Sequence, residues 1–420
     1  MKNSKVPLKE ILLLVAGWLT LVTLQFIFRR PPFYDEDEYL SNVALLHQYG
    51  WGKNYLEHLI GSAGPLFSVV HFIFEPLTHL NAPHIRFVNT GFLAGTTYFT
   101  YLTLGLLNFQ HRLYALFMMA IPMTYVIGGL ALTEMPAIFF FSAAVYLVIK
   151  STGLPAGIKQ SFLLLAAGAC MGLAILGRQP FLLTLAAFPV LFIAPAPGKK
   201  NTAGLFLFLL SSLALPGYVF MVWHGLVPTI ESQLYIDIAN AGTKYRPDFF
   251  LLCVFYFAIS LWLISPAFLR FPGGPQHAFK WIAGGCIIAA VNFATGWIEL
   301  LPVRPFLVKI LSPGQARILS LLFGSTAVVL SLYFLCCIYN NLQQQRFSKE
   351  FLFFSAACLL IAAACVKITW GFSSRYAAQA VPLLVLMGSY TYRRSKYNMA
   401  GVLLGVIIGV ICIFSYLTGV

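Results

Sequence analysis

Long apolar runs, separated by short polar or proline-containing turns, extend along the whole chain. A transmembrane helix needs about 20 mostly apolar residues, and lipid leaves an open backbone without hydrogen-bond partners. We therefore predict an all-α, polytopic transmembrane helical protein with about 13 helices, within a range of about 11 to 14. The predicted helices cover residues 10–28, 87–108, 113–132, 134–149, 160–177, 181–196, 203–222, 249–268, 281–299, 316–338, 351–368, 376–392 and 399–418.

We expect residues 1–420 to form a single membrane domain, with residues 29–86 as a first outer loop that contains short interfacial helices. The segment 64–80 is apolar but short, and His71, Glu75 and Pro76 interrupt it, so we predict an interfacial or re-entrant helix there. The first apolar run exceeds the roughly 7–15 residues of a secretory signal core and lacks a small-residue cleavage site, so we expect a retained first helix.

The composition supports a membrane protein, because 59% of the residues are hydrophobic and only 10% are charged, whereas soluble domains carry roughly 25% charged residues. The eight cysteines lie in apolar runs without metal-ligand spacing, which is typical of small buried hydrophobic residues. The net charge of +14 is explained by cytoplasmic loops and lipid phosphates. We therefore expect membrane lipids as partners and no nucleic acid.

The distribution of charge indicates an orientation. With the N-terminus in the cytoplasm, most Lys and Arg residues of the short turns fall on the cytoplasmic side, as the positive-inside rule requires. Of the 13 acidic residues, only Glu10 and Glu350 fall on that side. Because acidic residues contribute little to topology, we interpret their asymmetry as functional and predict an acidic site on the non-cytoplasmic face.

The strongest chemical signal is the run Asp35-Glu36-Asp37-Glu38, just beyond the first predicted helix. Four acids at a bilayer edge repel one another and are costly near hydrocarbon, which is the setting of a general base or a metal site. A solvated acidic turn is the alternative. Asp35 and Asp37 also resemble a metal-binding pair, but no diagnostic ligand spacing accompanies them, so a divalent metal is unsupported and no cofactor is predicted with certainty.

A second acid, Glu134, stands at an outer helix junction in Thr133-Glu134-Met135-Pro136. Helix capping and complementation of the helix dipole would explain it equally well. Its predicted position on the same face as the acidic run favours a functional role.

Basic residues also gather on the predicted outer face. Arg178 and Gln179 stand between two apolar runs, and a guanidinium is suited to a lipid-linked phosphate. Lys244, Arg246 and Arg375 lie beside tyrosines at outer helix ends, where each alone is also typical of an interfacial anchor.

Further candidates lie in the first outer loop. His71 and Glu75 are one helical turn apart and share a predicted face. Trp51 could stack on a sugar, although an interfacial belt explains such an aromatic residue as well.

Asp37-Glu38-Tyr39, followed by Ala44-Leu45-Leu46 and Tyr49-Gly50-Trp51, resembles the acidic motif that GT-C superfamily glycosyltransferases carry in their first outer loop; Asp35-Glu36 is the alternative register. The dolichyl-phosphate-glucose alpha-glucosyltransferase family of N-glycan precursor assembly is the most similar. That likeness depends on four segments in about the first 180 residues, Gly64–Val69, Ile85–Asn89, Thr133-Glu134 and Arg178-Gln179.

The resemblance implies a GT-C-like membrane glycosyltransferase. It would move a hexose, with inversion, from a polyprenyl-phosphate sugar donor to a lipid-linked or surface glycan acceptor at the non-cytoplasmic face of the bacterial inner membrane or the endoplasmic reticulum. Asp37 is the expected base, with Glu38, Asp35 and Glu134 as further catalytic candidates. The donor phosphate would be bound by Arg178, Gln179, Arg375, Lys244 and Arg246, and the acceptor would contact His71, Glu75 and Trp51.

Two other functions remain as alternatives. A transporter or flippase of a lipid-linked saccharide would show two related halves and charges near the bilayer midplane, and the sequence has no internal repeat. A polymer ligase would need a long loop late in the chain, whereas the longest predicted loop is the first.

Overall fold

A computed structural model describes the chain apart from its two ends and several internal segments. It covers residues 6–33, 35–61, 63–193, 202–228, 245–270, 275–300, 307–308, 311–345, 348–368, 371–392 and 395–419. Within these residues every regular element is a helix, which confirms the predicted all-α class.

The first half of the described chain forms one long helix, a group of three short helices and then a series of longer ones. Their bounds are α1 Leu8–Ile27, α2 Asp35–Tyr49, α3 Lys53–His58, α4 Leu66–Thr78, α5 His84–Leu106, η1 Arg112–Ala120, α6 Met123–Gly129, α7 Glu134–Thr152, α8 Ile158–Gly177, α9 Pro180–Thr184 and η2 Leu185–Phe192.

The second half contains mostly long helices. Their bounds are α10 Thr202–Trp223, α12 Pro247–Ile264, η4 Pro266–Leu269, α13 Pro275–Thr295, α15 Pro313–Gln344, α16 Lys349–Ala364, η5 Cys365–Lys367, α17 Ser374–Ala378, α18 Val381–Thr391 and α19 Lys396–Thr418. Each predicted segment overlaps a helix or a pair of helices. Eight described helices are long and apolar enough to cross a membrane, so the chain is a multi-pass membrane protein.

The structure differs from the prediction at 113–132, which we expected to be one continuous helix. Two helices, η1 and α6, meet there at 90°. Ile121 adopts an extended conformation immediately before Pro122, and proline disfavours the helical conformation in the residue that precedes it.

Polar side chains satisfy the carbonyl groups that this bent segment leaves without helical partners. The side-chain amide of Asn89 donates to the carbonyls of Leu130 and Leu132, at 2.7 and 2.8 Å. The Gln25 amide donates to the carbonyl of Gly129 at 2.8 Å. Buried carbonyls otherwise carry a desolvation cost, so these amides fix the path of the chain from α6 to α7.

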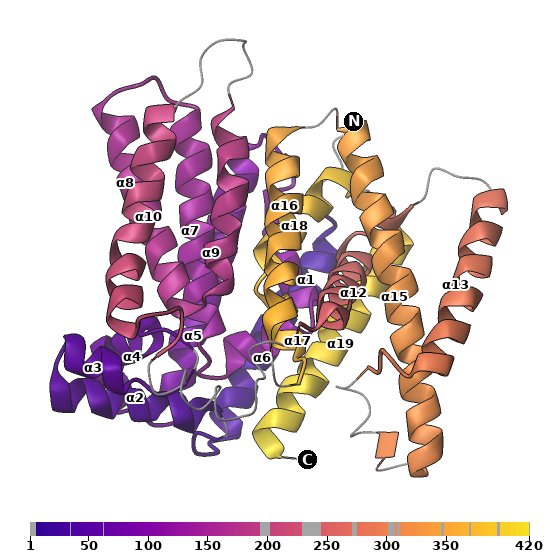
Figure 1. Cartoon of the computed structure of the whole chain (residues 1–420), viewed down its shortest axis with the longest axis horizontal. Helices are drawn as coiled ribbons and strands as arrows, with labels where there is room; N and C mark the ends of the chain where they lie inside the picture. Colours follow the sequence, from indigo (N-terminus) through magenta and orange to yellow (C-terminus); the bar gives the residue numbers. More distant parts are fainter. Residues whose placement is uncertain are drawn as a thin grey trace.

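The helices form a broad layered bundle (Figure 1). Helices α7, α8 and α10 pack side by side, α12, α16, α18 and α19 lie in the centre, and α13 packs on α15 at the far edge. Helices α2, α3 and α4 form a cap over one end of α7, α8 and α10, the end of the bundle at which the C-terminus also lies, while the N-terminus is at the opposite end. The expected first outer loop is thus largely helical.

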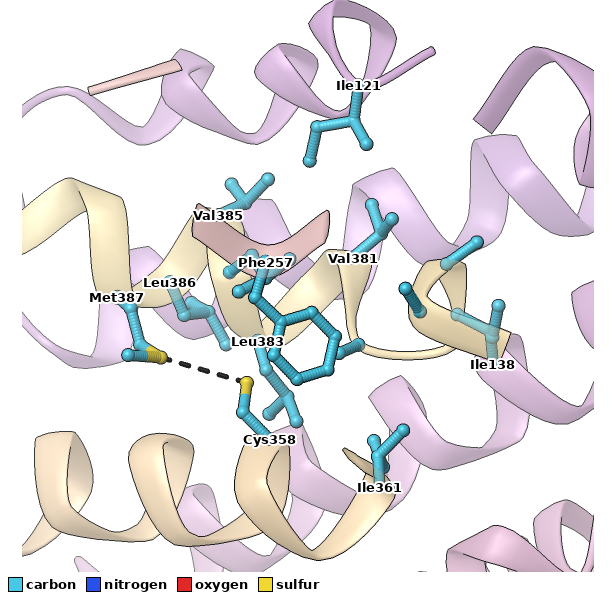
Figure 2. Close-up of a cluster of buried hydrophobic side chains, with 14 of the residues drawn as sticks. Ile121, Ile138, Phe257, Cys358, Ile361, Val381, Leu383, Val385, Leu386 and Met387 are labelled. Carbon is cyan, nitrogen blue, oxygen red and sulfur yellow. Dashed lines mark hydrogen bonds between the residues drawn. The ribbon is translucent and has the colours of Figure 1, made fainter. Parts of the chain in front are cut away.

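Apolar side chains from the central helices fill the core (Figure 2). Phe257 of α12 lies against residues of α18, and the Cys358 sulfur of α16 is 3.7 Å from the Met387 sulfur of α18. All eight cysteines are free, four of them buried, three half-buried and Cys286 exposed. The predicted role as small apolar residues therefore fits most of them.

A buried ion pair attaches the helical cap to the bundle. Both carboxylate oxygens of Glu36 in α2 accept hydrogen bonds from Arg86 in α5, at 2.9 and 2.7 Å. The backbone N–H of Ala131, between α6 and α7, donates to the same carboxylate at 2.8 Å. Glu36 and Arg86 are 1% and 0% exposed, so neither charge has water as a substitute partner.

We predict that Glu36→Ala destabilises the protein by about 3–5 kcal/mol, because it leaves the Arg86 guanidinium buried without its partner. Thermal unfolding in detergent measures the effect. Asp37→Ala is the matched control, since Asp37 is the next residue of α2 and its side chain is exposed, and it should change stability by no more than about 0.5 kcal/mol. Equal midpoints for the two variants would contradict a structural role for the pair.

Candidate functional site

The acidic run forms the first turn of α2, where carboxylates favour the positive end of the helix dipole. The helix directs the four acids to different surroundings. Glu36 is buried, Asp35 is partly buried, and Asp37 and Glu38 are exposed. Of the four, Asp35 and Glu36 therefore face the bundle.

A cavity of about 250 Å³ opens beside Asp35, and it is lined by Phe33, Asp35, Glu36, Leu130, Leu132, Ser373, Arg375 and Tyr416. The Arg375 guanidinium of α17 lies 2.5 Å from Oδ2 of Asp35. The Ser373 hydroxyl accepts hydrogen bonds from the backbone N–H and from Nε of Arg375. A carboxylate and a guanidinium that are 340 residues apart in sequence thus share one polar cavity.

A second ion pair joins the ends of two long helices. Glu134, the first residue of α7, pairs with Arg178, which directly follows α8. Gly177 permits the close approach, since a Cβ atom there would lie 2.7 Å from the Cβ of Ala137. Arg178 is almost fully buried, and its Nε has no hydrogen-bond partner among the described residues.

The two ion pairs form one electrostatic site. Burial alone would lower the pKa of Arg375, but the carboxylates of Glu134 and Asp35 outweigh it and raise that pKa above its usual value. Burial raises the pKa of Tyr39, one turn after Asp35, to about 12, with opposing contributions from Arg178 and Arg375. Asp35, Glu134, Arg178 and Arg375 therefore act electrostatically on shared neighbours.

The structure places other predicted residues apart from this cavity. Trp51 lies beyond the far end of α2, and the first and last of the 15 residues of this helix, Asp35 and Tyr49, are about 21 Å apart along its axis. The Trp51 side chain is 55% exposed. Trp51 therefore does not reach a ligand group held at Asp35.

His71 and Glu75 of α4 do not form a pair. His71 is fully buried, its ring 4.2 Å from that of Phe67, and neither ring nitrogen has a hydrogen-bond partner among the described residues. The Glu75 carboxylate instead lies near the surface, with its Oε2 2.5 Å from Nε2 of His47. Burial lowers the pKa of His71 to about 3, so its imidazole is neutral at physiological pH.

Two more predicted phosphate ligands have partners of their own. The Gln179 amide donates to the Leu226 carbonyl at 3.3 Å. Arg246 pairs with Asp248 at 2.7 Å and lies over the Phe249 ring. Lys244 falls outside the described residues.

Several residues of the site were not assigned a role from sequence. Tyr39 and Arg86 stand in the segments that carry the resemblance, but nothing in the sequence shows that they approach the acidic run. Ser373 is a short polar residue before a helix, which is a common N-cap signal. None of these signals distinguishes a site residue from a structural one.

The arrangement joins a carboxylate that can accept a proton with guanidinium groups that can bind an anion. Within the described part of the chain, no group of three or more His, Cys, Asp or Glu residues is placed to hold a metal ion.

Comparisons with known proteins indicate a likeness over part of the chain. Residues 54–224 match the family model described as dolichyl-phosphate-mannose-protein mannosyltransferase. This segment is less than half of the chain and includes Glu134, Arg178 and the Arg86 partner of Glu36. No curated protein sequence matches the chain.

Solved structures of low similarity also align with it. ArnT from Cupriavidus metallidurans bound to undecaprenyl phosphate aligns over 97% of this chain and 77% of its own, with 12% identity and a TM-score of 0.43. The S. cerevisiae Pmt1-Pmt2 complex bound to the sugar donor aligns over 59% of this chain, with 17% identity and a TM-score of 0.37, and this chain spans 37% of the matched yeast chain. The Archaeoglobus fulgidus oligosaccharyltransferase aligns over 91% of this chain and 54% of its own, with 15% identity and a TM-score of 0.31.

We predict that His71→Gln makes the free energy of unfolding less sensitive to a fall in pH. Because burial holds the folded-state pKa of His71 near 3, below the unfolded value of about 6.5, the unfolded state takes up a proton first as pH falls below 6.5. Proton uptake by His71 in the unfolded state therefore lowers the free energy of unfolding by about 2–3 kcal/mol as the pH falls from 6.5 to 4.5. Thermal unfolding across that range measures it.

The control for this experiment is His84→Gln, since His84 is exposed. His84→Gln should keep the acid dependence of the wild-type protein. An unchanged dependence in His71→Gln would mean that the buried imidazole takes up a proton in the folded state.

Proposed function

We propose that this protein is a membrane glycosyltransferase that uses a polyprenyl-phosphate hexose as donor. A lipid-linked or surface glycan would be the acceptor, as the sequence resemblance implies. The observation that carries the proposal is the placement of Asp35 and Arg375 in one polar cavity, with Glu134 and Arg178 in the same electrostatic site.

The transfer step uses these groups in complementary ways. The acceptor hydroxyl attacks the anomeric carbon of the sugar, its proton passes to a carboxylate, and the bond from that carbon to the phosphate oxygen breaks. The lipid phosphate leaves with the bonding electrons, and inversion follows from attack on the opposite face. A guanidinium beside the departing oxygen stabilises the developing negative charge.

We assign the general base to Asp35 in preference to Asp37. A base must lie within hydrogen-bond reach of the proton it accepts, and Asp35 lines the cavity while Asp37 and Glu38 are exposed on other faces of α2. Asp35 is 34% exposed, so an acceptor hydroxyl can approach it. This choice is the Asp35-Glu36 register of the acidic motif.

Arg375 and Arg178 are the proposed ligands of the donor phosphate. Arg375 is the nearer, since it lines the cavity itself. Glu134 orients Arg178 and adds to the field that keeps both guanidinium groups charged. The likeness over residues 54–224 favours mannose as the first sugar to test, with glucose next.

We place the site at the non-cytoplasmic face. The predicted orientation puts the N-terminus in the cytoplasm, and α2 and α17 lie at the end of the bundle opposite the N-terminus (Figure 1). The membrane would be the bacterial inner membrane or the endoplasmic reticulum.

We predict that Asp35→Asn lowers the transfer rate by about 10²–10⁴-fold, the usual contribution of a general base. Asp37→Asn, the matched control in the same helical turn, should keep the wild-type rate within about twofold. The measurement is transfer by purified protein from polyprenyl-phosphate mannose and polyprenyl-phosphate glucose to a glycan acceptor, with a thermal-unfolding check that both variants are folded.

Wild-type rates in Asp35→Asn together with loss of transfer in Asp37→Asn would move the base to Asp37. Movement of intact lipid-linked saccharide across the membrane of reconstituted vesicles, without sugar transfer to an acceptor, would instead support the flippase alternative.

A further inference from the structure

The carboxylates and guanidinium groups around the cavity neutralise one another. Asp35 pairs with Arg375, Glu36 with Arg86, and Glu134 with Arg178. An anionic phosphate that enters this site finds each of these cations already engaged. Its binding therefore benefits from positive charge that is not committed to a carboxylate.

Arg30 supplies such a charge at the edge of the cavity. Its guanidinium carbon lies 4.3 Å from the centre of the Phe33 ring, and its Nη1 donates to the Tyr416 carbonyl at 3.3 Å. Both Phe33 and Tyr416 line the cavity that holds Asp35 and Arg375. Arg30 has no carboxylate partner among the described residues, and the pairing with Tyr416 uses one of its five N–H donors.

The position of Arg30 suits a lipid phosphate. It follows the apolar helix α1 by three residues, which is the level of the membrane–water boundary where phosphates of lipids lie. Helices α1 and α19 run side by side there, with the Phe28 and Phe414 rings in edge contact at 5.4 Å. A lipid whose chain lay along these helices would carry its phosphate at the level of Arg30.

Arg29 is the natural comparison. It is exposed, and its Nε donates at 3.3 Å to the Phe26 carbonyl in the last turn of α1. No hydrogen bond, ion pair or ring contact joins it to a cavity-lining residue in the described part of the chain. The two arginines therefore share a level in the membrane but differ in their access to the cavity.

We propose that Arg30 binds the phosphate group of the lipid-linked donor at the mouth of the cavity, with Arg375 further inside. This assignment rests on the proposed function, because it takes a lipid phosphate as the ligand. A guanidinium can contact two phosphate oxygens at once, and the aromatic face of Phe33 holds it in place without neutralising its charge.

The test compares the binding of polyprenyl phosphate with that of polyprenol, the same lipid without the phosphate. The proteins are wild type, Arg30→Gln and Arg29→Gln in nanodiscs of neutral lipid. We expect Arg30→Gln to weaken polyprenyl phosphate binding by about tenfold or more, the loss of one charge-assisted contact, and to leave polyprenol binding unchanged. Arg29→Gln should remain within about twofold of wild type for both lipids.

Equal phosphate affinity in wild type and Arg30→Gln would overturn the assignment, and so would an equal loss in Arg29→Gln, which would indicate a general effect of surface charge. If Arg30→Gln does not fold, Arg30→Lys answers the same question: a lysine cannot make the forked contact, so affinity should fall a few-fold, and wild-type affinity would again overturn it. A wild-type protein that binds polyprenyl phosphate no better than polyprenol would defeat the proposed function as well.

Discussion

The buried carboxylate of Glu36 is the contact on which the rest of the site depends. It accepts hydrogen bonds from Arg86 in α5 and from the backbone N–H of Ala131, so it joins the cap, the bundle and the segment before α7. Asp35 is its neighbour in sequence and Glu134 follows Ala131 by three residues. A single ion pair thus fixes the distance between two carboxylates that begin different helices.

Charge balance is the second constraint. Removing charges from water is costly unless they are paired with good geometry, and each buried carboxylate around the cavity has a guanidinium partner. The balance keeps the site stable in the absence of a ligand. It also means that Arg375 and Arg178 meet an approaching anion while still paired with carboxylates, so an unpaired guanidinium at the mouth adds attraction for the proposed donor.

The sequence predicts the helices well, because twenty-residue apolar runs have one solution in lipid. The sequence also contains the cause of the break before α6, which is Pro122. The continuous apolar run around this proline nevertheless predicts a single helix. The choice among Asp35, Glu36, Asp37 and Glu38 could not be predicted. It depends on where α2 begins and on partners 50, 95 and 340 residues away, which no local pattern records.

The side-chain amides of Gln25 and Asn89 hold the backbone carbonyls at the end of α6 and in the turn that follows it, beside the cavity. Leu130 and Leu132 form part of its wall, and their carbonyls are bound by the uncharged side chain of Asn89. Amides neither titrate nor respond strongly to added salt. These two contacts are therefore insensitive to acidity and ionic strength, whereas the Ala131 N–H between them is held by the charged carboxylate of Glu36.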